Sequence, residues 1–281
     1  MVEIPTNIQK RLPKLWVEMS DIEKKITATL IAYIAGDAFG SFYEFSEIVP
    51  NIPNELLQKE DWPFGATSDD TSLTILTLLS LKEKSPEGAA RCFLDLLRSN
   101  VPHLRGLGPT TRAALGLPIK DSEVASVGFT NGAMMRTALL GLIFNEQERD
   151  IWVETFARST HRSYAIDAAI TLARAFSRGS FDNSSVWKNE NKGISNDAME
   201  TLQAIGYVIE RSDTPLDAMR LSCSLGGDTD TLAALTASLI SAHLGSYEKV
   251  FDIPWLEKID WIGIYGLNEA LKVVFSRLAT S

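Results

Sequence analysis

The sequence is poor in the side chains that usually form zinc sites and disulfide bridges. Its 281 residues include only two cysteines, Cys92 and Cys223, and three histidines, and no CxxC pair occurs. These numbers exclude a disulfide framework or a Cys/His metal cluster as the organising feature of the chain. Each cysteine lies in a helix-like segment, where we expect a reduced, buried, small apolar side chain.

Positive charge is also scarce, and no long apolar run is present. Lysine and arginine number 27 against 36 acidic residues, which gives a formal net charge of -9. This balance argues against nucleic acid or an anionic membrane as a partner, because clustered basic side chains hold both. Met1 to Lys14 lack the apolar core of a signal sequence, and the most apolar stretch, Ile26 to Ala35, is too short to span a bilayer. We expect a soluble, cytoplasmic protein.

The sequence lacks the alternation of apolar and polar residues that indicates strands, and it has no GxGxxG motif, Walker loop or internal repeat. Apolar residues instead recur at spacings typical of helices. We therefore predict an all-α fold, a single compact multi-helix globule over residues 23–281. Residues 1–22 would form a leader that either docks on a partner or is frayed in solvent. The polar stretch Arg178 to Asp197 is predicted to be a surface excursion. The predicted helices run from Lys24 to Ala38, Ser72 to Lys82, Pro86 to Arg98, Met134 to Phe144, Tyr164 to Ser177, Ala198 to Arg211, Pro215 to Ser224, Thr231 to Leu244 and Gly266 to Arg277.

Two acidic turns each open into an apolar helical segment. The first reads Ser68-Asp69-Asp70-Thr71 and the second Gly226-Gly227-Asp228-Thr229-Asp230-Thr231. Ser, Thr and Asp are common at helix N-termini, so each turn taken alone is explained by capping. Together, however, the turns crowd several carboxylates, which repel one another unless a cation lies between them. Hard cations such as Mg²⁺ and Mn²⁺ prefer oxygen ligands, so the pair of turns favours a two-cation site.

Three further motifs add polar groups suited to such a site. The segment Gly36-Asp37-Ala38-Phe39-Gly40 ends the first long helix, and the carboxylate of Glu44 follows it. The turn Thr130-Asn131-Gly132 leads into a helix whose free N–H groups suit a phosphate. Arg136 either serves the same anion or pairs with a surface carboxylate. His161 either lines the site or bonds a backbone carbonyl near a helix start.

These motifs resemble, in order and approximate spacing, those of the ADP-ribosylglycohydrolase family, and the likeness runs from about Ile26 to Leu244. The resemblance implies an all-α fold with two divalent cations, Mg²⁺ or Mn²⁺, in a central cleft. It also implies cleavage of the bond between ADP-ribose and a protein side chain. The implied metal ligands are Ser68, Asp69, Asp70, Asp228, Asp230 and Thr231. The implied catalytic residues are Glu44, Asp69 and Asp230, and those implied to bind substrate are Asn131, Gly132, His161 and Gly108.

Two positions depart from the family pattern. Ser68 stands where the first acidic turn usually begins with threonine, which keeps the hydroxyl but restrains its rotation less. In the loop from His103 to Thr111, Gly106 stands where some bacterial relatives carry an acid. The sequence therefore does not identify the group that gives a proton to the departing acceptor.

For function, we predict a metal-dependent hydrolase that removes ADP-ribose from arginine, with serine as the alternative acceptor. Short family members of this kind mostly act on arginine, and Glu44, Glu47 and the acidic turns would attract a guanidinium. The expected partners are ADP-ribose and an ADP-ribosylated protein. The competing hypothesis is a binding or immunity protein that covers an ADP-ribosyltransferase toxin, but the acidic residues of an active site are all present.

Overall fold

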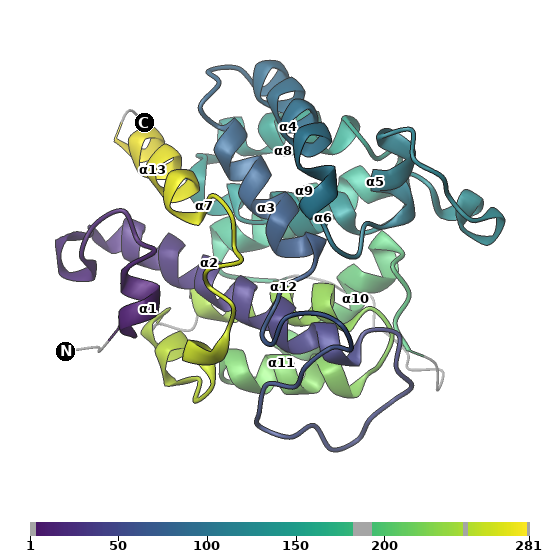
Figure 1. Cartoon of the computed structure of the whole chain (residues 1–281). Coiled ribbons are helices and arrows are strands. Elements are labelled where there is room, and N and C mark those ends of the chain that lie inside the picture. The colour runs from purple at the N-terminus through teal and green to yellow at the C-terminus, as the bar shows by residue number, and fades with distance from the viewer. Residues whose placement is uncertain (1–3, 182–192, 244–246, 280–281) are drawn as a thin grey trace.

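The chain folds into packed helices, as the apolar periodicity predicts. The structure, a computed structural model, describes residues 4–181, 193–243 and 247–279. No β-strand occurs within these ranges, where only isolated bridges join Thr130 to Asp197 and Ile194 to Gly227. The α-helices labelled in Figure 1 are α1 (Thr6–Gln9), α2 (Asp21–Gly40), α3 (Asp69–Ser80), α4 (Pro86–Asn100), α5 (Pro109–Ala114), α6 (Gly132–Thr137), α7 (Leu140–Ile143), α8 (Glu146–Arg158), α9 (Tyr164–Arg178), α10 (Ala198–Ile209), α11 (Pro215–Ser224), α12 (Thr229–His243) and α13 (Leu267–Leu278). Short 3₁₀ helices are η1 (Trp16–Glu18), η2 (Ser41–Tyr43), η3 (Val101–His103), η4 (Asp121–Ser126), η5 (Tyr247–Asp252) and η6 (Leu256–Lys258).

Helices α2 and α12 pack along each other at the centre through small residues. All of α12 from Thr229 to Ala242 is buried. A β-carbon at Gly36 would lie 2.4 Å from the Ala233 carbonyl oxygen, and one at Gly40 would lie 2.5 Å from the Thr229 carbonyl oxygen. The two backbones therefore touch at positions where only glycine fits. This contact brings the C-terminal end of α2 to the N-terminal end of α12.

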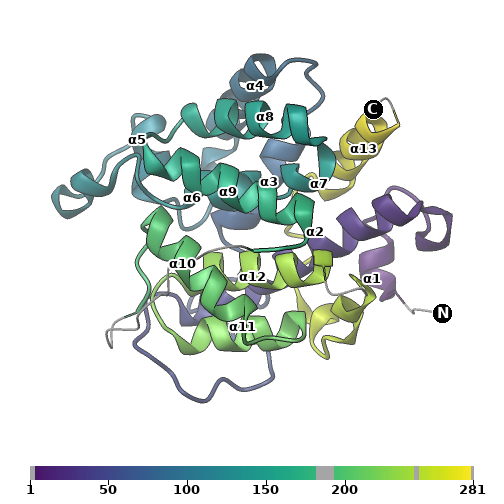
Figure 2. The ribbon, with the colours of Figure 1, turned by 180° about the vertical axis from the view of Figure 1, so that it is seen from behind.

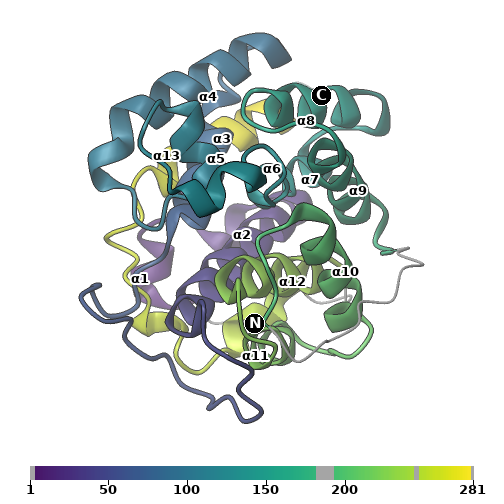
Figure 3. The same ribbon diagram turned by 90° about the vertical axis from the view of Figure 1, so that its right-hand side faces the viewer.

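The remaining helices surround this central pair. Figures 1 and 2 show α3, α4, α6, α8 and α9 on one side of α2 and α12, with α11 on the opposite side. Figure 3, which looks onto the side where α5 lies, shows α5 and α6 above α10 and α12. The N-terminal turns of α3, α6 and α12 are thereby directed toward a common region. No helix among the described residues combines the length and the apolar character that crossing a membrane requires.

The N-terminal segment packs against the helical body. Ile8, Leu12 and Trp16 are buried, and the Trp16 ring meets Phe251 edge-on with the ring centroids 5.1 Å apart. Leu15 is 53% exposed. The described part of the leader is therefore held by apolar contacts, and its docking on a partner stays a prediction.

The sequence predicts one continuous helix where the structure has two. The segment from Met134 to Phe144 forms two helices, α6 and α7, separated by a turn. A β-carbon at Gly141 would lie 2.0 Å from the Ala173 carbonyl oxygen, so α7 touches the backbone of α9 closely, and the turn allows this approach. The other predicted helices begin and end within three residues of the observed bounds. Most of the predicted surface excursion from Arg178 to Asp197 lies outside the described residues.

Candidate active site

Several chain segments meet at one cleft of about 550 Å³. The residue after η2, the first turns of α3 and α12, and the turn before α6 all contribute to its lining. Six carboxylates line it, and one of them, Glu123, is paired with Arg112. We call the other five the acidic cluster: Glu44, Asp69, Asp70, Asp228 and Asp230. The structure thus brings the two predicted acidic turns and Glu44 to one place.

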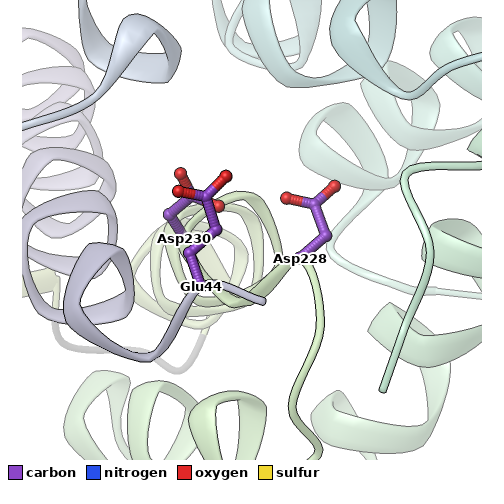
Figure 4. A group of neighbouring side chains, drawn as sticks. All are labelled: Glu44, Asp228 and Asp230. Atoms are coloured by element: carbon purple, nitrogen blue, oxygen red, sulfur yellow. The ribbon is translucent and has the colours of Figure 1, made fainter. Parts of the chain in front are cut away.

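Glu44, Asp228 and Asp230 form one compact part of the acidic cluster. Each offers a carboxylate oxygen, and these oxygens lie within 4.8 Å of one another. Figure 4 shows the three side chains pointing to the same side of the start of α12. Oxygen atoms at this spacing fit a hard divalent cation such as Mg²⁺ or Mn²⁺. Glu44, predicted to be catalytic, therefore also lies in a position suited to a ligand.

The first acidic turn leaves its carboxylates free for the cleft. Ser68 caps α3, because its hydroxyl oxygen accepts the N–H of Asp70 at 3.1 Å. Asp69 is therefore not needed as a cap, and Oδ2 of Asp70 is buried with no hydrogen-bond partner among the described residues. An orphaned carboxylate oxygen beside other carboxylates fits a bound cation. Thr231, the remaining predicted ligand, lines the cleft, whereas Ser68 lies beneath it as the cap.

Asp37 fixes the first turn of α3 to α2, a role that the sequence analysis missed. Its carboxylate accepts the backbone N–H groups of Ser68 and Thr71, each at 2.9 Å. It also accepts the hydroxyl of Ser41 at 3.2 Å. Asp37 is fully buried. The available signal was a lone carboxylate within an otherwise apolar helical run, since such a group must find hydrogen-bond donors when it is buried.

Burial dominates the electrostatics of the acidic cluster. It raises the pKa of Asp69, Asp70 and Asp230 well above the usual range, and neighbouring aspartate charges add to the effect. Burial, followed by the charge of Asp230, raises the pKa of Glu44 to about 7, although Lys59 opposes this shift. Glu44 can therefore exchange a proton near neutral pH. The whole cluster favours a bound cation, because a cation offsets the repulsion between its ionised carboxylates.

The fold and this arrangement of motifs match a known family along most of the chain. The family model of ADP-ribosylglycohydrolase matches residues 18–186 and 175–279. The chain belongs to the ADP-ribosylglycohydrolase family. Membership supports hydrolysis of linkages to ADP-ribose, and the family generally uses divalent metals.

Two similar proteins illustrate how this ADP-ribosylglycohydrolase family member relates to others. The Escherichia coli K12 protein YegU is 33% identical over 125 residues, which are 40% of this chain and only 37% of YegU. A solved structure of an ADP-ribosylglycohydrolase-related protein complex is 22% identical and has a TM-score of 0.70. That alignment includes 94% of this chain and 100% of the other. At this identity the structural likeness shows the shared fold.

In this member of the family, Asn131 holds one carboxylate of the acidic cluster. Its side-chain amide donates to Oδ2 of Asp228 at 2.7 Å and to the Thr201 hydroxyl at 2.9 Å. Its backbone N–H donates to the Asn196 carbonyl at 2.9 Å, so this N–H is not free for a phosphate. The following helix, α6, has only 6 residues. The main structural role of Asn131 is therefore to orient the Asp228 carboxylate within the acidic cluster.

The Asn131→Asp variant is expected to bind Mn²⁺ about 10- to 100-fold more weakly, which is the usual effect of losing a group that orients a metal ligand. The new carboxylate would face Asp228 where an N–H donor now lies. Titration of Mn²⁺ followed by electron paramagnetic resonance measures the change. The control is Thr201→Val, which removes the other acceptor of the same amide together with the hydrogen bond from that hydroxyl to the Asp197 carbonyl, and leaves Asp228 unchanged. An Mn²⁺ affinity that stays at the wild-type value in Asn131→Asp would contradict this role.

The other predicted substrate residues divide between the cleft and its supporting wall. Gly108 and Gly132 line the cleft. His161 is buried behind the wall, where its Nε2 lies 3.1 Å from the Thr130 hydroxyl and its Nδ1 lies 2.7 Å from the Thr160 hydroxyl. Burial, with the charge of Arg136, lowers the pKa of His161 well below its usual value. A neutral His161 ring thus supports the turn at Thr130 from outside the cleft lining.

Both sequence interpretations of Arg136 are wrong. The residue is only 2% exposed, and it donates to the Phe156 carbonyl at 3.0 Å and to the Thr160 hydroxyl at 2.6 Å. Its guanidinium carbon also lies 4.6 Å from the centroid of the Phe93 ring. Arg136 therefore stabilises the packing of α6 on α4 and α8, because it forms no ion pair with a described carboxylate and does not line the cleft.

The backbone at Gly106 accounts for the missing acid in the neighbouring loop. Gly106 has a φ of +81°, and a β-carbon there would lie 3.2 Å from Oδ1 of Asp69. A side chain at this position would therefore be strained and would crowd a cluster carboxylate. Lys59, which the sequence analysis also missed, lines the same cleft and pairs with Glu44.

Proposed function

We propose that the protein is a hydrolase that removes ADP-ribose from a modified arginine side chain with the help of two divalent cations. Family membership supports the coarser activity. The observation that carries the proposal is the convergence of the acidic cluster in a cleft large enough for a nucleotide-sized ligand. The unpartnered oxygen of Asp70 supports a cation there.

The proposed metal ligands come from opposite sides of the cleft. Asp69 and Asp70, with Ser68 beside them, would hold cations from α3, and Asp228, Asp230 and Thr231 would hold them from the start of α12. A bound divalent cation would supply positive charge that orients and polarises the hydroxyl groups of the ribose. Asn131 would keep Asp228 in place for this purpose.

Glu44 is the proposed proton acceptor. A water oxygen would form a bond to the anomeric carbon of the ribose while the bond from that carbon to the acceptor nitrogen breaks, and Glu44 would take the proton of the water. Positive charge that develops on the sugar would be stabilised by the carboxylates around it. The pKa of Glu44 is about 7 without bound cations, and cations beside it would lower that pKa, so Glu44 would be ionised and able to accept the proton.

The nature of the leaving group favours arginine over serine. A modified guanidinium is already protonated at neutral pH, so it departs as a neutral guanidine and then takes a proton from water. A serine alkoxide, in contrast, needs a proton during bond cleavage. The glycine at position 106, where some relatives carry an acid, is compatible with an acceptor that needs no such donor.

The ADP-ribose is proposed to extend from the acidic cluster toward the turn at residues 130–132. Arg112 and Lys120 line the same cleft and offer positive charge to a pyrophosphate, although Arg112 is also paired with Glu123. This pose keeps the distal ribose at the carboxylates and the pyrophosphate near the basic side chains.

Release of free ADP-ribose from matched arginine- and serine-modified peptides, with Mg²⁺ or Mn²⁺ present, tests the function. We expect faster release from arginine. The Glu44→Gln variant is expected to lose about 100-fold or more of this rate, as for other general bases. Glu47→Gln is the matched control, because Glu47 is an exposed carboxylate on the same loop and does not line the cleft. Faster release from serine would overturn the acceptor, and release from neither would favour a binding protein that covers an ADP-ribosyltransferase.

A further inference from the structure

Lys59 places a positive charge directly on the acidic cluster. It belongs to the loop of residues 45–67, which connects η2 to α3. The Lys59 ammonium forms an ion pair with Oε2 of Glu44, and the two side chains are 22% and 11% exposed. No other lysine or arginine among the described residues forms an ion pair with the acidic cluster. Glu44 thus already accepts an organic cation at the edge of the cleft.

An aromatic ring completes the surroundings of this ammonium group. Nζ of Lys59 lies 4.4 Å from the centroid of the Trp62 ring. The backbone N–H of Trp62 donates to the Lys59 carbonyl at 2.8 Å, so a tight backbone turn joins the two residues. A β-carbon at Gly106 would lie 3.8 Å from the same ring and 3.2 Å from Asp69. The Trp62 ring therefore lies next to Gly106, which lines the cleft, while Trp62 is not itself a lining residue. The guanidinium carbon of Arg105 lies 5.9 Å from the centroid of the same ring, so this ring already has one guanidinium near it.

A carboxylate beside an aromatic face is the combination that recognises a guanidinium. The planar group can form two parallel hydrogen bonds to a carboxylate and can stack on an aromatic ring at the same time. An ammonium group interacts with the carboxylate and with the ring only as a compact point charge, so it can neither form the two parallel hydrogen bonds nor stack. The Lys59 ammonium lies between a carboxylate and an aromatic ring. These surroundings therefore suit a guanidinium group better than an ammonium group.

We propose that Oε2 of Glu44 and the Trp62 ring form the subsite for the guanidinium of the modified arginine, with Oε1 of Glu44 left for the attacking water, and that Lys59 is a tethered competitor for this subsite. The inference rests on the proposed function, because it assumes an arginine acceptor. When the substrate guanidinium binds, the Lys59 ammonium leaves Glu44 and moves to solvent on its flexible stem. The pairing in the substrate-free protein offsets the charge of Glu44 until that exchange occurs.

Binding of agmatine, which carries a guanidinium group and a primary ammonium group but no ADP-ribose, tests the subsite by calorimetry with saturating Mg²⁺. The ligand control is 1,4-diaminobutane, in which an ammonium replaces the guanidinium and which should bind more weakly. Lys59→Met keeps an apolar stem of similar length and removes the competing charge, so its agmatine dissociation constant is expected to fall about three- to tenfold. Trp62→Leu is expected to raise that constant about two- to fivefold, the usual range for an exposed cation–π contact. Lys84→Met, at an exposed lysine outside the cleft, is the matched control and should leave the constant unchanged.

The outcomes separate this inference from the proposed function. An unchanged agmatine affinity in both folded variants would overturn the subsite, even if arginine-modified peptides are hydrolysed. The expected changes in affinity would support the subsite even if no peptide is hydrolysed, and in that case the proposed reaction alone would fail. If Lys59→Met does not fold, the Trp62→Leu result decides the inference by itself.

Discussion

Asp230→Asn lowers Mn²⁺ affinity and turnover together, each by at least about 100-fold, if the acidic cluster holds the catalytic cations. The substitution nearly keeps the shape of the side chain and removes one charge. Asp230 is 4% exposed, and its charge contributes to the raised pKa values of Glu44, Asp69 and Asp70. It is therefore the carboxylate whose loss changes the charge seen by the largest part of the cluster.

Two measurements on Asp230→Asn check this expectation. Titration of Mn²⁺ gives the affinity, and release of ADP-ribose from an arginine-modified peptide gives the turnover. The matched control is Asp95→Asn, because Asp95 is an exposed carboxylate on α4 with a side chain that is 76% exposed. A normal Mn²⁺ titration in Asp230→Asn would show that the cations bind elsewhere.

The metal-free protein is expected to lose stability as the pH rises from about 4.5 to about 7. The pKa of Glu44 is 4.5 when unperturbed and about 7 in the folded chain, so the folded state binds the proton more tightly. The resulting stabilisation is complete below pH 4.5 and disappears as the pH passes 7. One pKa unit corresponds to about 1.4 kcal/mol, so Glu44 alone contributes a decrease of about 3 kcal/mol in the free energy of unfolding.

Thermal unfolding in chelator at several pH values measures this decrease as a falling Tm. The other cluster carboxylates have raised pKa values as well and act in the same direction. Saturating Mg²⁺ or Mn²⁺ should raise the Tm at pH 7 and flatten the profile, because the cation binds the ionised form. Glu44→Gln should flatten part of the profile without metal. A metal-free Tm that rises steadily between pH 5 and pH 7 would contradict the expectation.

The acidic turns could be predicted because their chemistry is local. Asp69 and Asp70 lie in the first turn of a helix, as their neighbours in the sequence indicate, and the repulsion between carboxylates suggests a cation without knowledge of the fold. The all-α fold follows from apolar spacing in the same way. The joining of the two turns in one cleft was implied by the family resemblance and depends on the packing of α2 on α12.

The missed residues act through contacts between segments that are distant in the sequence. Asp37 caps a turn more than thirty positions away, with separations of 31 and 34 residues to Ser68 and Thr71. Lys59 lies in a loop without periodicity, so nothing in the sequence joins it to Glu44. Arg136 was misinterpreted because the helical pattern gives its position along α6 but not the neighbours that bury it.

The backbone contact between α2 and α12 constrains the positions of the carboxylates but not the loop that borders the cleft. Gly36 and Gly40 hold α2 against α12, so the core fixes the place where Asp228 and Asp230 begin α12 relative to the end of α2, which Glu44 follows after η2. The loop of residues 45–67, in contrast, has no α-helix and brings Lys59 and Trp62 to the edge of the cleft. Grafting this loop between relatives is therefore expected to transfer acceptor preference while the hydrolytic chemistry is retained.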